Sequence, residues 1–179
     1  MEKRNFKSKI SLACGSDNFR PAMEHLCFED GLIVATDAHI LIKQSIKLHG
    51  FTDEEIEILN GKFLHRDAFD EIYKYRNVTV TKKGFLCKNK NVTCLIEFSK
   101  VEFSYPKWRN VIPTGELHDI DEIGINTHFL KIAGKISLSE NKALRFHFYG
   151  KTKAIILSSL KSYITLDEEM ILIMPAQLA

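Results

Sequence analysis

The side chains that could take part in catalysis are few and scattered in this sequence of 179 residues. Asp37 and His39 stand two positions apart, a spacing at which a carboxylate could orient a histidine as a general base. No nucleophile stands in a recognisable motif beside them, and the nine glycines form no phosphate-binding loop. We therefore expect a protein without catalytic residues. A nucleic-acid-processing enzyme whose site has no known motif remains open as an alternative.

The four cysteines, Cys14, Cys27, Cys87 and Cys94, show no spacing typical of a metal site or a redox motif. The first seven residues carry charge but lack the apolar segment of a secretory signal. We expect free thiols, no metal, no cofactor and a cytoplasmic protein.

The composition suits a folded protein with a substantial core, because 45% of the residues are hydrophobic. No apolar run approaches the length of a membrane span, so we expect no membrane partner. The 25 basic and 23 acidic residues leave a net charge of +2. This balance neither requires nor excludes nucleic acid as a ligand.

The stretch 31–43 predicts two buried strands around a polar connection at 36–39, since short apolar runs rich in β-branched residues flank it. Further strands are expected at 9–14 and 22–29, around 79–80 and 85–87, at 92–98 and ending near Phe103. The acidic segment 50–60 could be a helix capped by Thr52, although an exposed connection is favoured. Apolar residues at helical spacing predict a helix within 64–76.

The pattern repeats in the last third of the chain. A strand at 123–125 leads to a helix capped by Asn126 or Thr127 and extending to Ile136. A hairpin follows at 143–149 and 153–159, and a last strand enters Met174 and Pro175. These elements predict an α+β fold in which a unit of strand, helix and antiparallel strands occurs twice.

Three pieces of the sequence resemble the bacterial replicative sliding clamp, the β subunit of DNA polymerase III. Thr36-Asp-Ala-His-Ile-Leu41 is similar to the family's Thr-Asp-Gly-His-Arg-Leu. Tyr105-Pro-Lys-Trp-Arg-Asn-Val-Ile-Pro113 resembles its Phe-Pro-Asp-Tyr-Arg-Arg-Val-Leu-Pro, and Leu172-Ile-Met-Pro-Ala-Gln-Leu178 resembles its terminal Val-Val-Met-Pro-Met-Arg-Leu. The pieces occur in the family's order.

The resemblance implies a DNA-clamp-like α+β fold with two helices packed on antiparallel sheets. Residues 1–113 match the family's second domain without its first helix, and residues 114–179 match the latter half of its third domain. The family's first domain and the front half of its third have no counterpart here.

The resemblance also implies a groove that binds short peptide motifs of replication or repair proteins. Apolar and flexible side chains would form an adaptable pocket, although the same residues could be ordinary core. The implied lining residues are Met23, Thr36, Ala38, His39, Ile40, Leu41, Pro106, Asn110, Val111, Leu172, Ile173, Met174, Pro175, Ala176 and Leu178. Ile40, Asn110 and Gln177 stand where the family has cations, which implies weaker or altered binding of acidic peptide positions.

In the family, helices that line a central hole hold duplex DNA. The residues that could take this role here are Lys131, Lys135, Arg66, Lys74 and Arg76. The acidic residues of the helix predicted within 64–76 make a phosphate-binding role for that helix less favourable. A charged helix face is also often simply solvated. The chain matches too few units to form the family's ring alone, so DNA binding would require a homo-oligomer. A peptide-binding adaptor or decoy of replication proteins without DNA binding is the main alternative.

Overall fold

The computed structural model describes residues 6–16, 19–75, 77–100, 104–140, 142–160 and 163–176. Arg76, Leu178 and the strand expected to end near Phe103 lie outside these residues.

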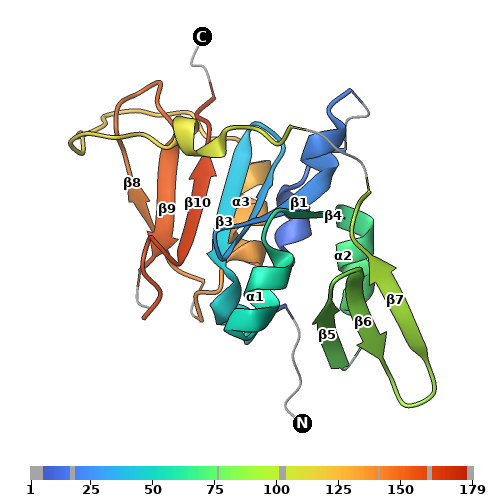
Figure 1. Ribbon diagram of the computed structural model, residues 1–179. Coiled ribbons are helices and arrows are strands. Elements are labelled where there is room, and N and C mark those ends of the chain that lie inside the picture. Colours follow the sequence, from blue (N-terminus) through green and yellow to red (C-terminus); the bar gives the residue numbers. More distant parts are fainter. Residues whose placement is uncertain are drawn as a thin grey trace.

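A sheet of seven antiparallel strands is the centre of the molecule, in the order β4-β1-β2-β3-β10-β9-β8 (Figure 1). Strands β3 and β10, far apart in sequence, are its paired central strands. The sheet therefore joins the regions 1–113 and 114–179, whose division into two domains stays a prediction. Its strands are β1 (His25–Glu29), β2 (Leu32–Thr36), β3 (Ile40–Ser45), β4 (Lys62–His65), β8 (Leu144–His147), β9 (Ile155–Ser159) and β10 (Glu169–Ile173).

A smaller antiparallel sheet stands beside the first, at the lower right of Figure 1. Its strands are β5 (Asn77–Thr81), β6 (Gly84–Lys88) and β7 (Thr93–Glu97). The helices of the described residues are α1 (Asp53–Leu59), α2 (Arg66–Ile72) and α3 (Thr127–Ile136). Short 3-10 turns are η1 (Ile10–Ala13), η2 (Pro21–Glu24), η3 (Ile46–His49) and η4 (Trp108–Val111). The predicted α+β class is confirmed.

Local side-chain chemistry sets the helix starts. Asn126 caps α3 by accepting a hydrogen bond from His128 N at 2.9 Å, as predicted. The favoured exposed connection at 50–60 is wrong, because Thr52 and Glu55 form a capping box that starts α1.

Two expected strands are also corrected. Residues 9–14 contain the 3-10 turn η1, in which Ile10 and Ala13 share a buried side three positions apart. At 123–125 only Gly124 makes a bridge, to Ala176.

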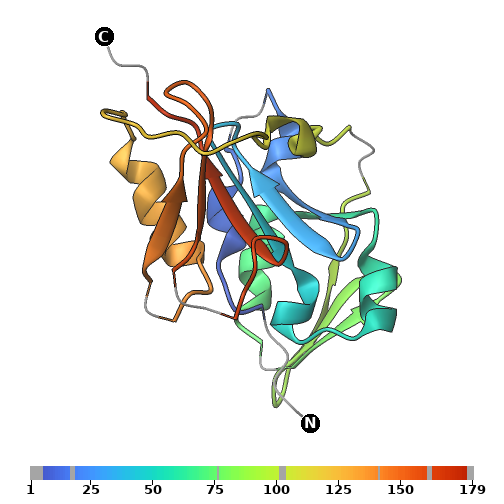
Figure 2. The ribbon, with the colours of Figure 1, turned by 90° about the vertical axis from the view of Figure 1, so that its left-hand side faces the viewer.

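The two faces of the large sheet are covered differently (Figure 2). One face, with Ile40, Ile42, Ile171 and Ile173, packs on η1, α2, α3 and the small sheet in the main core. The other face has the alternate residues of the same strands, and Trp108 of η4 covers part of it. We call these the helix face and the outer face. This alternation follows from the period of two along a strand.

A buried polar network ties the helix face to the end of α3. The Glu169 carboxylate accepts hydrogen bonds from Gln44 Nε2 at 2.6 Å, Leu138 N at 2.9 Å and Ser137 Oγ at 3.1 Å. Ser8 Oγ donates to Gln44 Oε1 at 2.6 Å, so the network extends to the segment before η1. These bonds satisfy polar groups that burial would otherwise destabilise.

Among the described residues, no helix is both long enough and apolar enough to cross a bilayer.

Candidate functional site

The turn between β2 and β3 is held by its own side chains. Asp37 Oδ1 accepts from the backbone amides of His39 and Ile40, both at 2.8 Å. Thr36 Oγ1 donates to Ile40 O at 2.8 Å and accepts from Ala38 N at 3.1 Å. Ala38 has φ +79°, a left-handed conformation that favours glycine, and the resemblance places a glycine there in the family.

Asp37 therefore shapes the turn through backbone amides. The His39 ring instead stacks on Phe129 of α3, with centroids 5.7 Å apart and planes at 20°. This arrangement gives the carboxylate a structural role and lends no support to the alternative of an Asp-His catalytic pair.

Three segments meet at the end of the sheet near this turn. Leu41 pairs with Leu172 across β3 and β10, and Met174 N donates to His39 O at 2.8 Å just beyond the pairing. On the outer face, Trp108 of η4 belongs to the same buried cluster as Leu41 and Leu172. The turn, η4 and the end of β10 are thus held together by one strand pair and one apolar cluster.

Exposed side chains surround this cluster. Val111 is 50% exposed and Met174 36% exposed, high values for large apolar residues. Ala38, His39, Asn110 and Ala176 are also exposed, and Pro106 and Pro175 are half-buried. We define the junction surface as Ala38, His39, Asn110, Val111, Met174 and Pro175.

The other residues of the predicted groove lie elsewhere. Ile40 and Ile173 were expected to line it, but strand alternation points them into the helix-face core, so this expectation is corrected. Leu41, Leu172 and Thr36 are buried beneath the surface. Met23, in η2, lies near the turn, because Met23 and Asp37 both flank Gly15. A Cβ atom built on Gly15 would be 3.4 Å from Met23 Cβ and 3.8 Å from Asp37 Cα.

A cavity of about 680 Å³ lies on the helix face between η1, the start of α2 and α3. Four cationic residues contribute to its lining, Arg20, Arg66, Lys131 and Lys135, together with His39 and His128. Its two carboxylates are engaged, since Asp70 accepts from Ser11 Oγ at 2.5 Å and Asp37 holds the turn. Arg66 donates to Gly15 O at 2.9 Å. We call this the cationic cavity.

The structure thus brings together Lys131, Lys135 and Arg66, three of the five cations considered for DNA. Lys74 is near the other end of α2, paired with Glu71, and is not part of the cavity. The sequence reasoning missed Arg20, which follows a turn and stands in no helical pattern.

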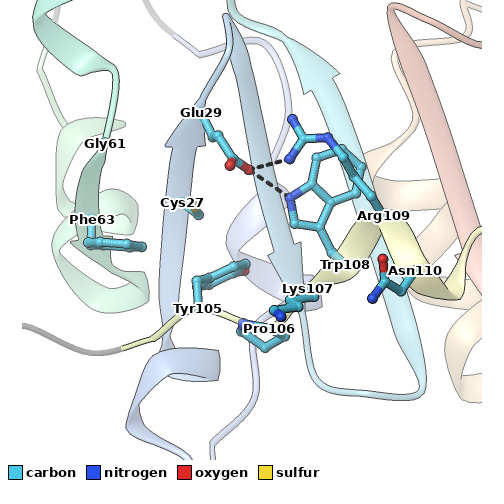
Figure 3. A pocket seen from close by; sticks show the side chains of 10 residues that line it. All are labelled: Cys27, Glu29, Gly61, Phe63, Tyr105, Pro106, Lys107, Trp108, Arg109 and Asn110. Carbon is cyan, nitrogen blue, oxygen red and sulfur yellow. Dashed lines mark hydrogen bonds and ion pairs between the residues drawn. The ribbon is translucent and has the colours of Figure 1, made fainter.

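A second hollow, of about 420 Å³, lies on the outer face beside η4 (Figure 3). Its lining includes Cys27, Glu29, Phe63, Tyr105, Lys107 and Trp108. Burial raises the pKa of the Cys27 thiol to about 12, so the thiol is protonated and unreactive at neutral pH. We call this the aromatic pocket; its signal in the sequence is the segment 105–109, which places two aromatic residues next to two cations.

Comparisons with known proteins agree with this architecture. No family model and no curated protein matches the sequence. Among solved structures, the DNA polymerase III β chain of Streptococcus pneumoniae TIGR4 is 15% identical, with a TM-score of 0.69 over 95% of this chain and 61% of that one. The β subunit of Borrelia burgdorferi, solved with a natural product, is 12% identical, with a TM-score of 0.67 over 96% of this chain and 59% of that one.

A sliding clamp of Bartonella birtlesii bound to griselimycin is 15% identical, with a TM-score of 0.65 over 95% of this chain and 63% of that one. The chain spans about six tenths of the length of these clamps. Because these clamps match 95% to 96% of its residues with TM-scores of 0.65 to 0.69, this protein has the fold of the bacterial DNA polymerase III β sliding clamp.

Proposed function

We propose that the protein is a non-enzymatic, clamp-like binding protein that takes short peptide motifs of replication or repair proteins at the junction surface. The observation that supports this most is the meeting of three segments, in which β3 pairs with β10 while Trp108 packs over Leu41 and Leu172. An apolar peptide side chain placed against Val111 and Met174 would bury surface that is now exposed.

The test is a titration of a fluorescein-labelled peptide that binds bacterial β clamps, read by anisotropy. Val111→Asp should weaken binding about tenfold or more, since one buried apolar anchor contributes roughly 1.5 to 3 kcal/mol. Val92→Asp is the matched control, because Val92 is 52% exposed, like Val111, but lies at the tip of the small sheet. Equal affinities for the intact protein and Val111→Asp would refute the junction surface as the binding site.

A second candidate function is binding of duplex DNA by a homo-oligomer. The cationic cavity favours it, because Lys131, Lys135 and Arg66 line this one cavity and both of its carboxylates are engaged in hydrogen bonds. Contacts to phosphates would give sequence-independent binding that falls steeply with salt. Replacing Lys131 and Lys135 by Glu should weaken it, whereas replacing the exposed Lys82 and Lys83 should not.

Failure to bind linear or circular duplex at low salt would favour the adaptor or decoy function without DNA. Light scattering would test the oligomer separately. A strict monomer at high concentration, with and without DNA, would remove any ring-like assembly.

A further inference from the structure

The aromatic pocket lies on the outer face, between β4 on one side and η4 on the other (Figure 3). Cys27 of β1 forms part of its floor, and register places Cys27 opposite Phe63 of β4. A volume of about 420 Å³ is within the range of small ligand sites. It shares Asn110 with the junction surface but is otherwise formed by different residues.

Trp108, Arg109 and Glu29 form one wall of the pocket, and their charges are already paired with each other. Trp108 is 4% exposed, and its Nε1 donates to Glu29 Oε2 at 3.0 Å. The Arg109 guanidinium lies 4.2 Å from the centre of the indole ring and donates to Glu29 at 2.8 Å and to Asp30 at 2.7 Å. Burial opposes the charge of Glu29, but the hydrogen bonds from Trp108 and Arg109 outweigh it and lower its pKa.

This wall excludes one class of ligand. Aromatic residues around a carboxylate often bind cations, but here Arg109 already covers the indole ring and already pairs with Glu29. A ligand cation would therefore find neither an open indole face nor a free carboxylate at this wall.

The opposite side presents apolar surface, and one available cation, Lys107, lies beside Pro106 and Trp108 (Figure 3). The rings of Phe63 and Tyr105 lie 5.9 Å apart at 31°, and Tyr105 Oη donates to Val34 O at 3.3 Å, so Tyr105 offers its ring rather than its hydroxyl. Lys107 lines the mouth, is exposed and makes no ion pair with any other residue that the structure describes. These groups suit an uncharged side chain next to a carboxylate.

We propose that the aromatic pocket is a second peptide subsite, which binds an aromatic side chain of an extended segment whose neighbouring carboxylate pairs with Lys107. The inference rests on the proposed function in that the segment belongs to a peptide-presenting partner. The exposed Asn110, between this pocket and the junction surface, supplies an amide for hydrogen bonds to the peptide backbone.

The chain contains a built-in reporter for this site, because Trp108 is its only tryptophan. The probes are three tetrapeptides, acetyl-Gly-Phe-X-Gly-amide with X as Asp, Asn or Lys, titrated against the intact protein while Trp108 emission is recorded. The Asp peptide should bind several-fold more tightly than the Asn peptide, and the Lys peptide most weakly. No saturable change with any peptide, or equal affinity for all three, would overturn the proposal.

Charge reversal at the mouth gives the sharper test. Lys107→Glu should invert the order of the three peptides, whereas Lys83→Glu, an exposed lysine on the small sheet, should leave it unchanged. Phe63→Ala should weaken all three about tenfold, with circular dichroism confirming the fold. An unchanged order in Lys107→Glu would refute the predicted ion pair and with it the subsite.

The subsite and the junction surface can fail separately. Val111→Asp should weaken binding of the clamp-binding peptide about tenfold or more and leave tetrapeptide binding unchanged. If the tetrapeptides bind as expected but Val111→Asp does not affect the clamp-binding peptide, only the junction surface is refuted. If Val111→Asp weakens binding of the clamp-binding peptide but the tetrapeptides do not bind as expected, only the aromatic pocket is refuted.

Discussion

The helix face and the outer face of the large sheet are built from the same strands but sealed in different ways. On the helix face, the Phe6 ring lies within 6.4 Å of the rings of Phe28, Phe51, Phe69 and Phe85, in a core shared by helices and the small sheet. On the outer face, the buried cluster is small and is covered in part by the irregular segment around η4. The difference teaches that the helix face is packed for stability, whereas the proposed peptide sites lie where the cover is irregular, since surface left open by an irregular cover is what a ligand can use.

Neighbouring residues of β10 offer the most direct comparison. Ile171 faces the helices, Leu172 faces η4, and each is 1% exposed. Ile171→Ala should lower the free energy of unfolding by about 4 to 5 kcal/mol, and Leu172→Ala by about 2 to 3 kcal/mol, because the irregular cover can settle into the space. Urea unfolding followed by circular dichroism measures both. Equal losses would show that the two faces are packed equally tightly.

The buried network should come next in size. Glu169→Ala removes the acceptor of Ser137 Oγ and Leu138 N and one of the two acceptors of Gln44 Nε2, which keeps Ile136 O, so we expect a loss of about 2 to 3 kcal/mol in the free energy of unfolding. Glu168→Ala is the control, because within the described part of the chain its carboxylate accepts only from the exposed Thr165. A loss below about 1 kcal/mol for Glu169→Ala would show that the network contributes little to the stability of the helix face.

Acid should weaken the helix face through His49. Burial, and then the nearby Lys7, lower the pKa of His49 from 6.5 to about 4, and its Nδ1 accepts from Lys7 N at 2.8 Å. A histidine with a lowered folded pKa stabilises the fold above its unfolded pKa. That contribution is lost as pH falls from about 6.5 towards 4. The loss in the free energy of unfolding reaches about 2 kcal/mol at pH 5.

Urea unfolding at pH 7.5 and pH 5 would measure this loss. His49→Phe should flatten the pH dependence, whereas His128→Phe, on the exposed side of α3, should leave it as it is. An unchanged slope in His49→Phe would assign the acid sensitivity to other groups.

The smallest effect is expected on the outer face. Arg109 is half-exposed, so its ion pairs with Glu29 and Asp30 are screened, and Arg109→Ala should change the free energy of unfolding by less than about 1 kcal/mol. Trp108 emission should nevertheless shift to longer wavelength as water reaches the indole. A loss in the free energy of unfolding comparable to that of Ile171→Ala would contradict the difference in packing between the two faces.

The sequence predicted the parts of the fold that short-range chemistry determines. Asn126 and the apolar period of α3 specify that helix, and β-branched runs specify β2 and β3. The segment at 9–14 was misassigned because a single turn is too short to distinguish helical from alternating burial, and its conformation depends on packing against α2 and α3.

The candidate sites were predicted unevenly for a related reason. The three motifs indicated which segments meet at the junction surface, but strand alternation decided that Ile40 and Ile173 point away from it. The aromatic pocket depends on the pairing of Cys27 with Phe63 and on the docking of η4 over β1. Such register and docking are tertiary properties that local patterns do not contain.

The position of β10 has a consequence for how the chain reaches this structure. β10 follows the other nine strands of the described residues in sequence, yet it lies between β3 and β9. During synthesis, both of those strands would have an unpaired edge until β10 leaves the ribosome. Joining β3 to a strand about 130 residues later is a slow, non-local step, so the nascent chain should need protection from aggregation until β10 has been synthesised.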